Sequence, residues 1–171
     1  MAQADKEILV EWLRDAYALE MQAIDLLTAQ VGRLQHYPEV QARLRRHADE
    51  SRQQANLVRS CLVRHGSDVS VVKTGLAHFM AGAQAVMTSM TADEVVRDVV
   101  ATFAFENLEI GTYRALLAAA QACGDDETRR VCEEILRQEE EMASWIGARI
   151  TEVAGTYISR RDDFDFGAAK R

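Results

Sequence analysis

Proline and β-hairpin signals are scarce in this sequence. Among its 171 residues there is one proline, Pro38, and no Asn-Gly or Asp-Gly pair marks a tight hairpin turn. Hydrophobic residues make up 48% of the chain and charged residues 27%. Because that balance is typical of ordered, helix-rich proteins, the composition predicts a single all-α domain.

Clustered positive charge is also lacking. The net charge is -7 and no run of Lys and Arg alternates with aromatic residues, so we expect no nucleic-acid partner. The first residues, Met1 to Glu7, are too polar for a secretory signal. The longest stretch poor in charge, 75–92, is interrupted by His78 and Gln84 and is too polar for a good membrane span. We therefore expect a cytoplasmic protein with no membrane partner.

Cysteines are few and show no pairing pattern. Cys61, Cys123 and Cys132 make an odd count without a Cys-x-x-Cys motif, which excludes an even disulfide framework. We expect reduced thiols that fill apolar space, as buried cysteines commonly do.

Glycine and proline divide the chain into helical segments. Pro38 suits the first position of a helix, where a missing amide hydrogen costs no hydrogen bond. Thr91 and Glu94 form a Thr-x-x-Glu capping box, and Asp125 or Asp126 can cap a later helix. Four glycines suit the left-handed position that follows a helix: Gly32, Gly66, Gly124 and Gly155. The pattern predicts helices over 4–31, 39–65, 69–89, 92–122 and 126–154.

The order of these helices predicts their connectivity. The first two long helices are joined by a short loop, as are the last two, and the shorter helix 69–89 occupies a crossover between the two hairpins. Two helical hairpins joined by a crossover are the connectivity of a ferritin-like four-helix bundle. We therefore predict such a bundle over 1–155, followed by a C-terminal tail over 156–171 that lacks helical periodicity.

Each long helix carries a glutamate within its apolar stripe. The 3–4 spacing of core positions on the first helix includes Glu20. On the second helix the stripe passes through His47 and then through either Glu50 or Ser51. The third and fourth helices contribute Glu106, Glu109 and Glu139. All these acids fall near the middle of their helices, so antiparallel packing would bring them to one level.

Such a layer of acids is costly without cations. An ionised carboxylate in a protein core costs several kcal/mol, and like charges that face each other add to that cost. Two metal ions would reverse the balance, and carboxylate ligands favour iron or manganese over copper, with zinc less suited. We predict a site for two metal ions, iron first and manganese second, held by Glu20, Glu50, Glu106, Glu109, Glu139 and His47.

Other roles for these residues remain open. His47 could serve as a structural residue, and Tyr17 and Tyr113 could be core aromatics, hydrogen-bond donors to the acids or redox partners. The acids could instead pair with arginines, of which six are available: Arg43, Arg46, Arg52, Arg114, Arg137 and Arg149.

The ordered set of motifs resembles a bacterial family. From about residue 5 to 153 the sequence is similar to the YciE/YciF-like, stress-associated ferritin-like proteins. The resemblance implies a ferritin-like fold, a dimetal site and a homodimer. The motifs that carry it are Leu13-x-Asp15-x-Tyr17-x-x-Glu20-x-Gln22, His47-x-x-Glu50-Ser51, Glu106-x-x-Glu109-Ile110-x-x-Tyr113 and Leu136-x-x-Glu139-Glu140.

The sequence departs from the better-known di-iron pattern, in which Glu-x-x-His recurs on the second and fourth helices. Here Gln53 follows Glu50 and Met142 follows Glu139 at the histidine positions. The leading hypothesis is a dimetal protein that reacts with oxygen or peroxide as the small oxidant. The alternatives are iron storage and a structural or stress-interaction role with a residual or empty site. For the last of these, the middle segment offers an apolar surface: Val72, Leu76, Phe79, Met80, Ala83, Met87 and Met90.

Overall fold

The computed structural model describes the backbone of residues 2–69 and 94–168 and the side chains of 5–69 and 94–160. In those ranges the chain forms four helices: α1 (Ala2–Val31), α2 (Pro38–Arg64), α4 (Glu94–Cys123) and α5 (Asp126–Ala168). The predicted all-α class is confirmed. The predicted helix 69–89, its apolar surface and the capping residue Thr91 lie outside the described residues.

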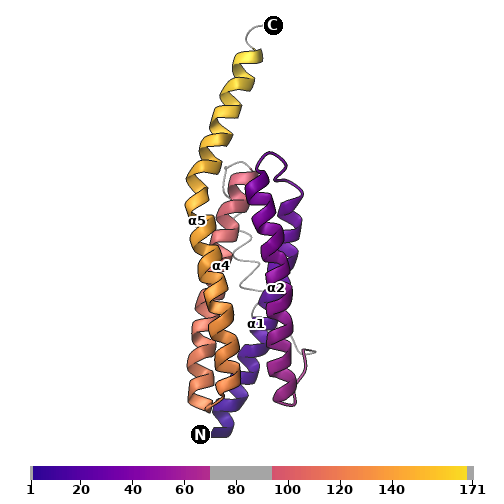
Figure 1. Cartoon of the computed structure of the whole chain (residues 1–171), viewed down its shortest axis with the longest axis vertical. Coiled ribbons are helices and arrows are strands. Elements are labelled where there is room, and N and C mark those ends of the chain that lie inside the picture. The colour runs from indigo at the N-terminus through magenta and orange to yellow at the C-terminus, as the bar shows by residue number, and fades with distance from the viewer. Residues whose placement is uncertain (1, 70–93, 169–171) are drawn as a thin grey trace.

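The helices pack as two antiparallel hairpins, α1 with α2 and α4 with α5 (Figure 1). The hairpins face each other through α1 against α4 and α2 against α5. Near the end of α1, Gln30 donates to the Asp98 carbonyl at the start of α4 (3.1 Å). At the other end of the bundle, Arg64 of α2 contacts Asp125, which precedes α5 (2.9 Å). The ends of α2 and α4 that the chain must connect therefore lie at opposite ends of the bundle, as a crossover requires.

Two of the four predicted glycine stops have the left-handed backbone that ends a helix. Gly66 and Gly124 have φ of 70° and 65°. After each glycine the next amide reaches back to a helix carbonyl, Ser67 to Leu62 (3.0 Å) and Asp125 to Ala120 (2.9 Å), as in a Schellman motif. The amide of Thr128 donates to Asp125 Oδ1 (3.1 Å), so Asp125 and not Asp126 caps α5.

The other two glycines do not have the predicted left-handed backbone. Gly32 still follows the predicted end of α1 at Val31, whereas the helix end predicted at Gly155 is wrong. α5 therefore continues through Gly155 and past the predicted end at 154 to Ala168, as the yellow helix that extends beyond the bundle in Figure 1 shows. Ser159 Oγ bonds back to the Gly155 carbonyl (3.0 Å), and the Arg160 guanidinium lies 5.5 Å from the centre of the Tyr37 ring. The division into a bundle to 155 and a tail stays a prediction.

The core contains two large apolar clusters with a polar layer between them, and a third, small cluster of Leu19, Ala23 and Phe105. One cluster contains Leu13, Val58 and Leu116, with Ile135 from α5. The other is built around Leu44, Val99 and Ile146. On every helix, buried polar residues lie at mid-bundle between the two large clusters: Glu20, His47, Ser51, Gln54, Glu106, Glu109 and Glu139. The apolar side chains on both sides separate this layer from the ends of the bundle.

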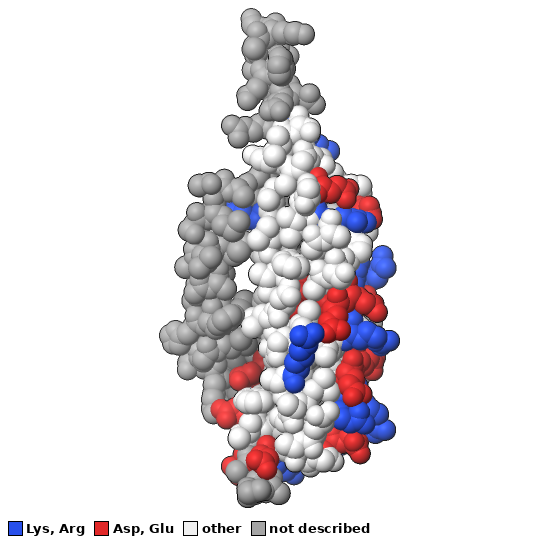
Figure 2. Space-filling view, turned by 90° about the vertical axis from the view of Figure 1, so that its left-hand side faces the viewer, with Lys and Arg blue, Asp and Glu red and all other residues white. Residues whose placement is uncertain are grey.

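The face that Figure 2 shows carries charged side chains of both signs. Lys, Arg, Asp and Glu side chains are intermixed along one side of that face, without a patch of one sign. Pairs such as Arg129–Glu133 (2.7 Å) join neighbouring turns of a helix. Over the described ranges, no helix has an uncharged apolar stretch of the length needed to cross a bilayer.

A glycine pair tests the helix-ending role of the left-handed turns. Gly124→Ala should lower the free energy of unfolding by about 1–2 kcal/mol, because a side chain disfavours positive φ. Gly111, in the interior of α4, has negative φ and open space around it. Gly111→Ala should raise the same quantity by about 0.5–1 kcal/mol, because alanine loses less backbone entropy. Urea unfolding of both variants measures the difference, and equal effects would contradict the turn geometry.

Candidate metal centre

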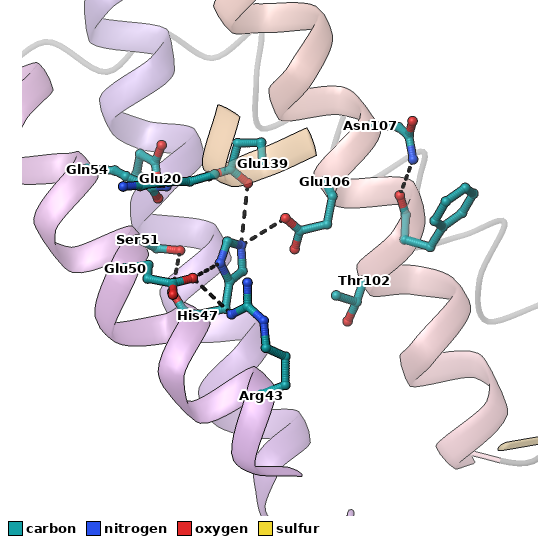
Figure 3. A network of polar contacts seen from close by, with 12 residues as sticks. Glu20, Arg43, His47, Glu50, Ser51, Gln54, Thr102, Glu106, Asn107 and Glu139 are labelled. Carbon is teal, nitrogen blue, oxygen red and sulfur yellow. Dashed lines mark hydrogen bonds and ion pairs between the residues drawn. The ribbon is translucent and has the colours of Figure 1, made fainter. Parts of the chain in front are cut away.

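His47 is the centre of the polar layer. Its side chain is fully buried, and its two ring nitrogens face carboxylates from three helices (Figure 3). Nδ1 lies 2.8 Å from Glu50 Oε2 on the same helix. Nε2 lies 2.8 Å from Glu106 Oε2 of α4 and 3.4 Å from Glu139 Oε2 of α5. A histidine for which the sequence left structural and ligand roles open thus contacts three of the predicted acids.

Four of the six predicted residues form a compact group. One potential ligand atom from each of His47, Glu106, Glu109 and Glu139 lies within 4.8 Å of all the others, and all four residues are buried. Glu20 belongs to the same layer, with 1% of its surface exposed, and its charge acts on Glu139 and Glu106. The structure therefore brings five of the predicted residues into one buried layer.

Glu50 occupies a different place. Its side chain is 28% exposed, whereas the Glu106 and Glu139 side chains are 2% and 0% exposed. Arg43 NH1 binds the same Glu50 oxygen that faces His47, at 2.9 Å. Ser51, the other residue considered for this stripe position, is the fully buried one, and its hydroxyl donates to the His47 carbonyl (3.1 Å). Glu50 therefore lies at the edge of the layer.

Two uncharged side chains hold acids of the layer in position. The Tyr113 hydroxyl, fully buried, donates to Glu20 Oε1, so the donor role considered for this tyrosine is confirmed. Tyr17 is half-buried and packs against the neighbouring apolar cluster. Gln54 Nε2 donates to Glu139 Oε1 at 2.5 Å and to Gln138 at 2.9 Å. The sequence places Gln54 on the stripe but gives no sign of this contact.

Arginine pairing does not explain the buried acids. Among the described residues, Arg43–Glu50 is the only ion pair between an arginine and one of the six predicted residues. Three other arginines that the sequence offered form surface pairs instead: Arg52 with Asp49, Arg114 with Glu140, and Arg149 with Glu39.

Several buried carboxylate oxygens in the layer have no hydrogen-bond partner within the described part of the chain. They are Glu20 Oε2, both oxygens of Glu109 and Glu139 Oε2. A buried carboxylate oxygen without a partner costs free energy, and most such atoms in native proteins are satisfied. Oxygen-rich sets with one imidazole suit iron or manganese. The types of ligand and the oxygens without hydrogen-bond partners therefore both fit a metal site.

Burial shifts the protonation of the acids. Burial, aided by the charge of Glu139, raises the pKa of Glu20 well above its ordinary value. Burial also raises the pKa of Glu106 to about 8, although hydrogen bonding to His47 opposes the shift. Burial and the charges of Glu139 and Glu20 raise the pKa of Glu109. In the absence of cations, the layer therefore holds protons that an exposed glutamate would release.

Hydrogen bonds to His47 act in the opposite direction. Burial opposes a charged imidazole, but the contacts with the carboxylates of Glu106, Glu139 and Glu50 outweigh it and raise the pKa of His47 well above its ordinary value. Burial would raise the pKa of Glu139, yet its contacts with His47 and Gln54 lower it. The imidazolium and the Glu139 carboxylate therefore form the ionic centre of the metal-free layer.

This fold and site define the class of the protein: a ferritin-like helical bundle with a buried His/Glu cluster that could hold a metal. The chain belongs to the family described as Domain of unknown function (DUF892), whose model matches residues 4–159. The YciF-like resemblance seen in the sequence is confirmed by this match and by the structural neighbours.

Three solved structures illustrate the relationship. A protein of Xanthomonas campestris pv. campestris is 35% identical, with a TM-score of 0.80 over 93% of this chain and 99% of that chain. The Escherichia coli stress protein YciF is 18% identical, with a TM-score of 0.73 over 88% and 97%. The bacterioferritin of Desulfovibrio desulfuricans, described with a diiron site, is 21% identical, with a TM-score of 0.72 over 94% and 90%. The last two likenesses support the fold alone.

Tyr113→Phe tests the support of Glu20. Removal of the hydroxyl leaves Glu20 Oε1 without its donor in a buried place, so the metal-free protein should lose about 1–3 kcal/mol of its free energy of unfolding. Tyr17→Phe, on a half-buried tyrosine, is the matched control and should change stability by less than about 0.5 kcal/mol. Chelator-treated proteins unfolded in urea give both values. Equal losses would show that the Tyr113 contact contributes nothing specific.

The raised pKa values predict how the stability of the metal-free protein depends on pH. In the unfolded chain glutamates lose their protons near pH 4, but folded Glu20, Glu106 and Glu109 keep theirs to higher pH. The folded state then binds more protons, so its free energy of unfolding should fall as pH rises from about 5 to 8. Glu106→Gln, which cannot ionise, should reduce this fall. A flat profile in chelator-treated wild type would contradict the shifts.

Proposed function

We propose that this protein is a dimetal carboxylate protein that binds two iron or manganese ions in the mid-bundle layer and reacts there with oxygen or peroxide. The observation that carries the proposal is the set of buried oxygens on Glu20, Glu109 and Glu139 that have no hydrogen-bond partner within the described residues, beside His47 and Glu106. Apolar clusters flank the layer on both sides, and cations are the partners that best satisfy these oxygens.

Charge balance supports two divalent ions. Glu20, Glu106, Glu109 and Glu139 are the acids with about 1% or less of their surface exposed. Fully ionised, they carry a charge equal and opposite to that of two divalent cations, and neutral His47 adds a nitrogen ligand. One ion would leave an excess of buried negative charge, which is costly in a core.

The residues would divide the work between holding the ions and excluding water. Bound iron or manganese would supply the electrons for the oxidant and a Lewis acid to orient it. Tyr113 fixes Glu20 and Gln54 fixes Glu139, so these two carboxylates are oriented before an ion arrives. The apolar clusters around Leu116 and Val99 keep bulk water from the layer.

The relatives agree with the proposal in general terms. The bacterioferritin with a similar fold is described with a diiron site in different catalytic states, and YciF is described as a stress protein. A reaction that removes oxidant would be consistent with both descriptions. We further propose that the protein works in the cytoplasm as a homodimer, and a native mass of two chains would argue against a storage shell.

A non-catalytic role is the second candidate, and one observation favours it. His47 contacts Glu50, Glu106 and Glu139, so the layer has an internal cation even without metal. Protons held by the remaining acids would neutralise the rest. In that case the layer would specify the packing of the bundle, and the description of YcfI, a structural neighbour from Rhodopseudomonas palustris, proposes a structural role for that protein.

Element analysis by mass spectrometry on tag-free protein purified without chelator tests the proposal first. Wild type should contain close to two iron or manganese ions per chain. Glu20→Ala/Glu106→Ala should lose them, because it removes two of the four buried carboxylates. Glu140→Ala/Glu141→Ala is the matched control, since both glutamates are exposed, and it should keep the metal.

The outcomes separate the two candidate functions. Metal-dependent consumption of peroxide that disappears in Glu106→Ala would support the reaction with oxidant. Protein that binds metal but consumes neither oxygen nor peroxide would leave a binding role. Folded wild type that contains no metal and cannot be loaded with Fe²⁺ or Mn²⁺ would refute the proposal in favour of the structural role.

A further inference from the structure

We infer that Glu50 is not a metal ligand but a positioning residue, which Arg43 holds in place so that it orients the His47 ring toward the metal layer. This inference rests on the proposed function, which it refines by assigning separate roles to the residues of α2. It departs from the prediction made from the sequence, where Glu50 was one of six ligands.

The spacing of three residues on α2 creates this arrangement. Arg43, His47 and Glu50 are separated by four and three positions, so they follow one another along one face of the helix. Their contacts form a chain. Arg43 NH1 donates to Glu50 Oε2 at 2.9 Å, and the same oxygen lies 2.8 Å from His47 Nδ1. One carboxylate oxygen therefore bridges a guanidinium and an imidazole, as Figure 3 shows.

The two nitrogens of His47 consequently have different roles. Nδ1 faces a carboxylate that an arginine keeps ionised, so Nδ1 carries the hydrogen of that bond. Nε2 points to the other side of the ring, toward Glu106 at 2.8 Å and Glu139 at 3.4 Å. A ligating histidine commonly donates its second N–H to a carboxylate, which fixes the tautomer and the ring orientation. Glu50 provides that contact, and Nε2 is left for the metal.

Exposure and charge place Glu50 outside the ligand set. Its side chain is 28% exposed and that of Arg43 is 13% exposed, whereas His47 is fully buried. Arg43 and Glu50 neutralise each other, so the four buried carboxylates alone balance two divalent ions. Arg43 and His47 hold Glu50 through Oε2, and ligation by Glu50 would add a charge to a layer that is already neutral.

A Co²⁺ titration distinguishes a positioning residue from a ligand, because it reports the number of ions, their affinity and the coordination spectrum. Glu50→Ala should still bind two ions at saturation but about 10–100-fold more weakly, as is typical when the carboxylate behind a ligating histidine is lost. Glu50→Gln should restore most of that affinity, because its amide oxygen accepts the Nδ1–H bond. It should also keep the visible absorption bands of the wild type.

Two further variants control the measurement. Glu140→Gln changes an exposed glutamate of α5 and should leave the number of ions and their affinity unchanged. Arg43→Met introduced into the wild type should change the affinity for Co²⁺. The same change introduced into Glu50→Ala should leave the affinity as it is, because Arg43 acts through Glu50. Circular dichroism checks that each variant is folded. If Glu50→Ala is not folded, Glu50→Gln takes its place in the comparison, because glutamine keeps the size and hydrogen bonding of the side chain.

Different results overturn different claims. Loss of one ion in Glu50→Gln, or a spectrum that shows one fewer oxygen ligand, would make Glu50 a ligand and overturn the inference while the proposed function stands. Unchanged affinity in Glu50→Ala would show that Glu50 does not position His47. Folded wild type that takes up no Co²⁺, Fe²⁺ or Mn²⁺ would overturn the proposed function and the inference together.

Discussion

The burial of several carboxylates in an apolar bundle is the constraint on which the rest of this structure depends. Three of the four helices, α1, α4 and α5, would form a simpler core with leucine at the level where Glu20, Glu106, Glu109 and Glu139 lie. Acids at those places are tolerated only if something opposes their charge. In the metal-free chain that opposition comes from His47 and from protons, and both leave some oxygens without partners among the residues that the structure describes. The arrangement is therefore incomplete as it stands, which is a property of binding sites more than of structural cores.

Much of the fold and of the polar layer could be predicted from the sequence. The apolar stripes identify their helices, because side chains three and four positions apart share a helix face. An acid such as Glu139 within such a stripe must then point inward, and it is fully buried. Gly66 and Gly124 end their helices because both have positive φ. For the apolar stripes of the four long helices the sequence and the structure agree, but α5 continues to Ala168 although 156–171 lacks helical periodicity.

The remaining features depend on contacts between helices, which periodicity does not encode. The helix spacing allowed either Glu50 or Ser51 at the core-facing position of α2. In the structure Glu50 bonds to Arg43 at the edge of the layer, and Ser51 is the buried residue. The role of Gln54 depends on the packing of two helices, because Gln54 of α2 donates to Glu139 of α5. Gly155 resembled a helix stop in sequence, but its φ is not positive and α5 continues. Neither the neighbour of a side chain nor the φ of one glycine can be derived from a stripe.

The two hairpins divide the layer between them. The first hairpin supplies Glu20 and His47, and the second supplies Glu106, Glu109 and Glu139. Neither hairpin alone therefore contains the set. An ion shared by both would act as a cross-link between segments far apart in the sequence, and its binding free energy would add to the stability of their docking. If the layer binds metal as proposed, loading would therefore make the association of the two hairpins harder to reverse.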